Sequence, residues 1–67
     1  MTVNGKEISL QTEMSVKTFL ESKGYNLPSL PRVAVEKNGV IISRDFYASE
    51  MLSDSDVLEI VGYVGGG

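Results

Sequence analysis

Cysteine and histidine are both absent from this chain of 67 residues. Their absence excludes disulfides, Cys/His zinc sites, iron–sulfur clusters and any thiolate or imidazole nucleophile. The remaining nucleophilic side chains have no recognisable partner, and no phosphate-binding glycine motif precedes the predicted helix. We therefore expect no catalysis by the chain alone, no bound cofactor and no metal site.

Positive charge is also sparse, because the six lysines and arginines are scattered and the formal net charge is −3. This distribution argues against nucleic-acid binding. The first residues lack the charged and apolar regions of a signal peptide, and no apolar run approaches the length of a membrane span. We expect a cytoplasmic location and no membrane association.

Acidic residues gather in the second half of the chain, at Asp45, Glu50, Asp54 and Asp56. They lack the spacing of a calcium-binding loop, and their neighbours are turn-forming residues. The pattern therefore favours solvated turn residues over metal ligands.

Two Asn-Gly dipeptides, Asn4-Gly5 and Asn38-Gly39, separate short segments of strand-forming composition. Asn-Gly readily supplies the two positive φ angles of a type I′ turn between antiparallel strands. The expected strands are 1–3 and 6–10 around the first turn, and 33–37 and 40–43 around the second.

A short helix is predicted after Ser15, whose hydroxyl can accept a hydrogen bond from an unpaired amide of the first turn. Val16, Phe19 and Leu20 recur at the spacing of one buried helix face. Gly24 can adopt the left-handed conformation that ends a helix. The helix therefore has one apolar side.

The segment 57–61 is apolar at nearly every position, which favours a central strand covered on both faces. The preceding segment, 44–53, has no strict period and is interpreted as a packed connection and turn. Two strands, a helix, two strands and a last central strand make an α+β domain with a mixed sheet and one main helix on one face. This order is that of a β-grasp domain.

The last three residues are glycines, so we divide the chain into a β-grasp domain, 1–64, and a flexible tail, 65–67. Three extended residues project the carboxylate of Gly67 roughly 10 Å beyond the domain, far enough to enter a narrow active site. Glycines also permit close approach of a partner. The alternative is a frayed terminus or linker without function.

Aromatic and apolar residues near the tail are candidates for partner docking. Tyr63 and Val64 lie at the base of the tail, although Tyr63 can equally pack against the sheet edge. Phe46, Tyr47 and Met51 can form an exposed patch, but in so small a protein a role in the core is the favoured interpretation.

Several motifs together give the chain a family resemblance. They are Val3-Asn4-Gly5, Val33-Ala34-Val35-Glu36 with Asn38-Gly39, Asp56-Val57-Leu58-Glu59-Ile60, and Val64-Gly65-Gly66-Gly67. With these motifs in this order, essentially the whole chain resembles the ThiS sulfur-carrier family of thiamin biosynthesis.

The resemblance implies a carrier that is a protein co-substrate and not an enzyme. A ThiF-like enzyme would use ATP to adenylate the carboxylate of Gly67, and a sulfur donor protein would supply sulfur to form a thiocarboxylate. A ThiG-like thiazole synthase would then receive the sulfur. The essential terminal pair of the family matches Gly66 and Gly67, and Gly65 extends the reach of the tail.

Three other functions remain open from the residues alone. The small subunit of molybdopterin synthase has the same fold and activation chemistry, although the chain length favours the thiamin carrier. A ubiquitin-like modifier would instead acylate lysines through Gly67. A non-covalent β-grasp interaction module would not need the tail at all.

Overall fold

The structure is a computed structural model, and it describes residues 1–24 and 33–62. Within these ranges no helix is long and apolar enough to cross a membrane. The elements in chain order are β1 (Thr2–Val3), β2 (Lys6–Glu7), β3 (Met14–Ser15), α1 (Val16–Ser22), β4 (Val33–Lys37), β5 (Val40–Ile42), the 3-10 helix η1 (Arg44–Phe46), β6 (Met51–Leu52) and β7 (Val57–Gly62).

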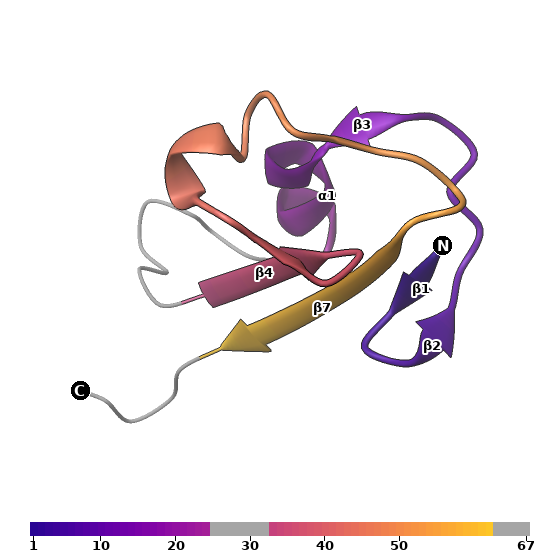
Figure 1. Cartoon of the computed structure of the whole chain (residues 1–67). Helices are drawn as coiled ribbons and strands as arrows, with labels where there is room; N and C mark the ends of the chain where they lie inside the picture. Colours follow the sequence, from indigo (N-terminus) through magenta and orange to yellow (C-terminus); the bar gives the residue numbers. More distant parts are fainter. Residues whose placement is uncertain (25–32, 63–67) are drawn as a thin grey trace.

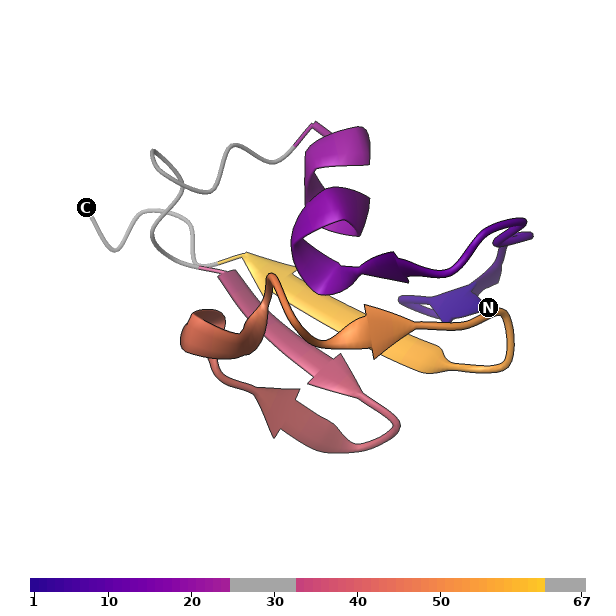
Figure 2. The ribbon, with the colours of Figure 1, turned by 90° about the horizontal axis from the view of Figure 1, so that it is seen from above.

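A mixed five-stranded sheet with the order β2-β1-β7-β4-β5 forms the body of the domain (Figure 1). β7 lies at its centre, parallel to β1 and antiparallel to β4. Figure 2 shows α1 packed on one side of β4 and β7. This architecture confirms the predicted α+β fold and the central position of the last strand.

Both Asn-Gly turns adopt the predicted conformation. Asn4 and Gly5 have φ angles of 50° and 84°, and Asn38 and Gly39 have φ angles of 53° and 84°. The first hairpin is shorter than expected, because β2 ends at Glu7 and not at residue 10. Further along, the amide of Leu10 donates to the Asp54 carboxylate, 2.8 Å away, instead of to a neighbouring strand.

The helix begins and ends as the sequence predicts. The Ser15 hydroxyl accepts a hydrogen bond of 3.1 Å from the amide of Thr18, which makes it the N-cap. Gly24 follows the helix with a φ of 92°, a conformation that glycine adopts at no steric cost. The predicted apolar face is confirmed, because Val16, Phe19 and Leu20 are all buried.

The segment 44–53 contains regular structure that the sequence did not indicate. η1 opens it, and β6 pairs with β3 in a separate two-stranded sheet. Carbonyls of this segment also accept hydrogen bonds from the first helical turn. The amide of Val16 donates to the Glu50 carbonyl and the amide of Lys17 to the Tyr47 carbonyl, each at 2.8 Å. Strands of two residues are too short to show an alternating pattern, which is why β6 was not predicted.

One part of the strand prediction is wrong, because β7 is not covered on both faces. Leu58 and Ile60 are buried beneath the helix, whereas Val57, Glu59 and Val61 are exposed. Successive side chains of a strand point to opposite faces of the sheet, and within residues 1–24 and 33–62 a helix covers only one of them. Burial therefore alternates along β7 although hydrophobicity does not.

Candidate functional site

The candidate reactive tail follows directly on β7. This strand remains paired to its last residue, since Gly62 lies opposite Val33 of β4. The predicted tail glycines Gly65, Gly66 and Gly67 and the predicted docking residues Tyr63 and Val64 lie outside the described residues. The described part of the chain thus defines the strand from which the tail departs and the surface beside it.

The asparagines of the two turns bind β7 through their side chains. The Asn4 amide group continues the pairing beyond β1: its Oδ1 accepts from the amide of Ile60 at 2.7 Å, and its Nδ2 donates to the Ile60 carbonyl at 3.1 Å. At the start of the strand, Asn38 Oδ1 accepts from the amide of Val57 at 2.8 Å. Both turns therefore hold the central strand in place.

Asp56 completes the contact at the start of β7. Its carboxylate accepts hydrogen bonds from Asn38 Nδ2 at 2.9 Å and from the amide of Ser53 at 2.8 Å. Burial opposes ionisation of this carboxyl, but the hydrogen bonds from Ser53 and Asn38 outweigh it and hold its pKa below the usual value. The expectation that Asp56 is a solvated turn residue is therefore wrong, because it is buried and connects two turns.

The neighbouring carboxylates also have partners within the chain. Asp54 accepts from the amide of Leu10 at 2.8 Å and from the ammonium of Met1 at 3.0 Å, and these contacts lower its pKa. Glu50 accepts from Lys37 Nζ at 2.7 Å, and this hydrogen bond raises the pKa of Lys37. Among the described residues, no group of three or more Asp or Glu side chains is placed to hold a metal ion.

The candidate docking residues of the connection separate into two environments. Tyr47 is 3% exposed, donates its hydroxyl to the Val33 carbonyl at 3.3 Å, and has its pKa raised by burial. Phe46 is 58% exposed and Met51 is 48% exposed. The preferred interpretation as core residues thus holds for Tyr47 and is wrong for Phe46 and Met51, which lie on the surface.

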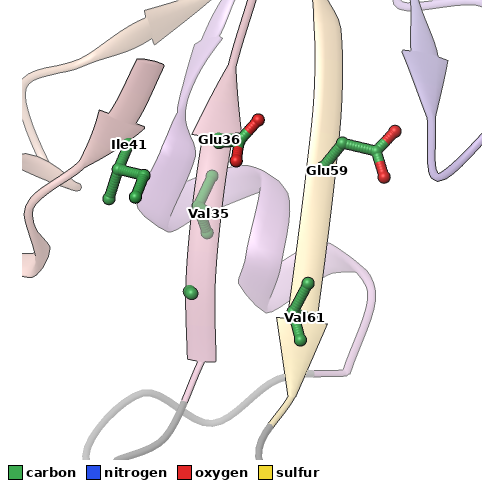
Figure 3. A pocket seen from close by; sticks show the side chains of 6 residues that line it. Val35, Glu36, Ile41, Glu59 and Val61 are labelled. Carbon is green, nitrogen blue, oxygen red and sulfur yellow. The ribbon is translucent and has the colours of Figure 1, made fainter. Parts of the chain in front are cut away.

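The most distinctive surface feature lies on the face of the sheet opposite α1. We call it the open face and define it by Ala34 and Glu36 of β4, Ile41 of β5, and Val57, Glu59 and Val61 of β7. A hollow of about 150 Å³ lies between these strands and is lined by Ala34, Val35, Glu36, Ile41, Glu59 and Val61. Figure 3 shows Glu36 and Glu59 side by side on neighbouring strands, with α1 behind the sheet.

The charge on the open face is of one sign. Glu36 and Glu59 are direct cross-strand partners, and Ile41 lies opposite Glu36 on its other side. The ion pairs found in the described parts of the chain join Met1 to Asp54 and Lys37 to Glu50, so neither involves these two glutamates. Sequence reasoning missed this site, although a glutamate in the middle of an apolar strand signals a solvated face.

Comparison with known proteins identifies relatives over the whole chain. The model of the ThiS family matches residues 1–67. A sulfur carrier protein ThiS from Bacillus subtilis is 37% identical, over 100% of this chain and 98% of that protein. The crystal structure of a thiamine biosynthesis protein (ThiS) from Geobacter metallireducens superposes with a TM-score of 0.79 at 28% identity, covering 98% of this chain and 96% of that chain.

A second kind of relative is much longer than this chain. A thiazole synthase from Paramagnetospirillum magneticum is 36% identical over all of this chain, but the match covers only 20% of that protein. The chain spans about a fifth of the length of the two thiazole synthases that it matches. In these proteins a segment similar to this chain is part of the same polypeptide as a thiazole synthase.

Proposed function

We propose that this chain, which belongs to the ThiS family, carries sulfur for thiamine biosynthesis on the carboxylate of Gly67. The observation that carries the proposal is the family match over residues 1–67, which includes the three glycines that follow the central strand. Members of this family are sulfur carriers, so the chain is a protein co-substrate and not an enzyme.

The proposed chemistry begins with activation of a carboxylate, which is a poor electrophile. A ThiF-like partner joins the Gly67 carboxylate to the α-phosphate of ATP, which releases pyrophosphate and leaves an acyl-adenylate. Sulfur at the oxidation level of sulfide, supplied by a donor protein, then attacks the acyl carbon. A C–S bond forms, AMP leaves with one former carboxylate oxygen, and the product is a thiocarboxylate. ATP is thus bound by the partner and not by this chain, and we expect the reaction to take place in the cytoplasm.

The relatives favour thiazole formation as the destination of the sulfur. Proteins named thiazole synthase contain a segment similar to this chain, and two relatives matched over nearly their whole length are a sulfur carrier protein ThiS and a thiamine biosynthesis protein (ThiS). We therefore name thiazole synthase as the acceptor, ahead of molybdopterin synthase. Because glycine has no side chain, a tail of Gly65, Gly66 and Gly67 can enter first the active site of the ThiF-like enzyme and then that of thiazole synthase.

Intact mass spectrometry tests the proposal. The chain is incubated with ATP, a ThiF-like enzyme and a sulfur donor, and we expect a mass gain equal to the replacement of one oxygen by sulfur, localised to Gly67. Deletion of Gly66 and Gly67 should abolish the gain while the thermal melt stays unchanged. Gly67→Ala should slow adenylation without affecting folding. An unchanged mass with an activating enzyme that modifies its own carrier would contradict the proposal.

A further inference from the structure

The open face combines apolar side chains with an unbalanced pair of charges. Ile41 is 71% exposed and Val61 is 51% exposed, although both are large aliphatic residues. They flank Glu36 and Glu59, which line the same hollow. Large apolar residues grouped at the surface around a few polar groups are typical of a binding site.

Glu36 and Glu59 repel each other in the unbound chain. Like charges directly opposite each other on neighbouring strands are destabilising. Neither glutamate belongs to an ion pair in the described parts of the chain, so no contact found there offsets the repulsion between them. A cation from another molecule would remove the repulsion and satisfy both carboxylates.

Among cationic side chains, arginine suits this site best. Its guanidinium is planar, carries five N–H donors and can bind carboxylates through two parallel hydrogen bonds. It is also more weakly hydrated than the lysine ammonium, so it enters an apolar surface at a lower desolvation cost. The hollow is lined by both glutamates and by the apolar side chains of Ile41 and Val61, and the exposed Glu59 side chain, whose carboxylate points away from Glu36 in Figure 3, can turn toward it.

The position of the open face indicates which molecule supplies the arginine. Glu59 and Val61 belong to β7, the strand that leads into the tail, so a protein that receives the tail is brought close to this surface. Two relatives also carry a segment similar to this chain within a thiazole synthase polypeptide. The acceptor of the sulfur is therefore the partner expected here.

We propose that the open face docks against thiazole synthase, and that Glu36 and Glu59 together bind one arginine side chain of that enzyme. Ile41 and Val61 pack against apolar groups around this arginine. The identity of the partner rests on the proposed function, whereas the chemistry of the contact rests on the open face itself.

The test measures the affinity of the full chain for purified thiazole synthase by isothermal titration calorimetry. The double variant Glu36→Gln with Glu59→Gln keeps the shape of both side chains and removes the charge. We expect it to bind about 30-fold more weakly or worse, because removing one side of a hydrogen-bonded charge pair at an interface leaves the other unpaired. The control is Glu21→Gln on the exposed side of α1, which should bind like the wild type.

A double-mutant cycle then identifies the arginine. Surface arginines of thiazole synthase are changed to glutamine one at a time and titrated with both the wild type and the double variant. One arginine should weaken binding of the wild type strongly and binding of the double variant hardly at all. Finding that every arginine acts equally on both chains would overturn the proposal.

The remaining outcomes separate this inference from the proposed function. If thiocarboxylate forms and sulfur reaches thiazole synthase, but the double variant binds like the wild type, the docking inference is wrong and the carrier function stands. If no thiocarboxylate forms, the carrier function fails regardless of docking. If the wild type does not bind thiazole synthase, or sedimentation shows a dimer that the double variant disrupts, the open face has another occupant and the inference is wrong.

Discussion

The two faces of β7 are built from similar side chains but have opposite environments. Leu58 and Ile60 are buried against α1, whereas Val57 and Val61 point to solvent on either side of Glu59. The hydrophobicity of a residue therefore does not decide which face is covered. That depends on where α1 packs, and the aliphatic residues left on the open face are available for binding.

The largest difference in stability between the two faces should appear when the side chain of a core residue is truncated. Phe19 is a buried aromatic residue of α1 beneath the sheet, with 2% of its surface exposed. Phe19→Ala should lower the free energy of unfolding by about 3–5 kcal/mol, through lost burial and the cavity left behind. Because so small a domain has little stability to lose, we expect the variant to be unfolded at room temperature. Circular dichroism and urea titration measure this.

The matched control for this substitution is Phe46→Ala. Phe46 is the same residue type but is largely exposed, so its replacement should change the free energy of unfolding by no more than about 0.5 kcal/mol. If both variants melted alike, the distinction between covered and exposed aromatic residues would be wrong.

A smaller loss of stability is expected at the start of β7, where the Asp56 carboxylate connects two turns. Asp56→Ala removes the acceptor of the Ser53 amide and of Asn38 Nδ2. Leaving such partly buried donors unpaired should cost about 1–3 kcal/mol in free energy of unfolding, measured by urea titration at neutral pH. Asp45→Ala, at an exposed aspartate of η1, is the control and should be nearly neutral. Equal effects at the two positions would show that Asp56 does not hold the strand.

Acid should remove part of the same stabilisation without any substitution. The pKa values of Asp54 and Asp56 lie below their usual value in the folded chain, so their ionised forms favour folding. This contribution is complete above the pKa of an unfolded aspartate, about 3.9, and is lost as the pH falls through the lower folded values. Urea titrations between neutral and acidic pH should show the decline, and Asp56→Asn should flatten it. A stability independent of pH below 4 would contradict the assignment.

Local sequence signals predicted most of the fold. Asn-Gly turns, the Ser15 cap and the Gly24 stop act through neighbouring residues, so they can be recognised without the rest of the structure. The side-chain contacts of Asn4 with Ile60 and of Asn38 with Asp56 connect residues far apart in the sequence, and turn preference alone gives no sign of them.

The open face was missed for a related reason. Glu36 and Glu59 become neighbours only through the pairing of β4 with β7, and this register cannot be read from either segment alone. The apolar run of β7 also favoured coverage on both faces, because periodicity in sequence reports hydrophobicity and not the number of layers in the domain. The docking candidates Tyr63 and Val64 stay a prediction, since they lie outside the described residues.

The smallest expected effect concerns the open face and has the opposite sign to those on the covered face. Glu59→Gln removes one of two like charges that face each other across β4 and β7, so it should raise the free energy of unfolding by about 0.2–1 kcal/mol. The gain should shrink in high salt, because exposed charges are screened, and urea titrations at two ionic strengths measure it. A loss of stability would mean that Glu59 has a favourable partner within the chain. A gain would show that the folded chain is more stable without this charge, as expected if the glutamate pair is kept for a cation on another protein.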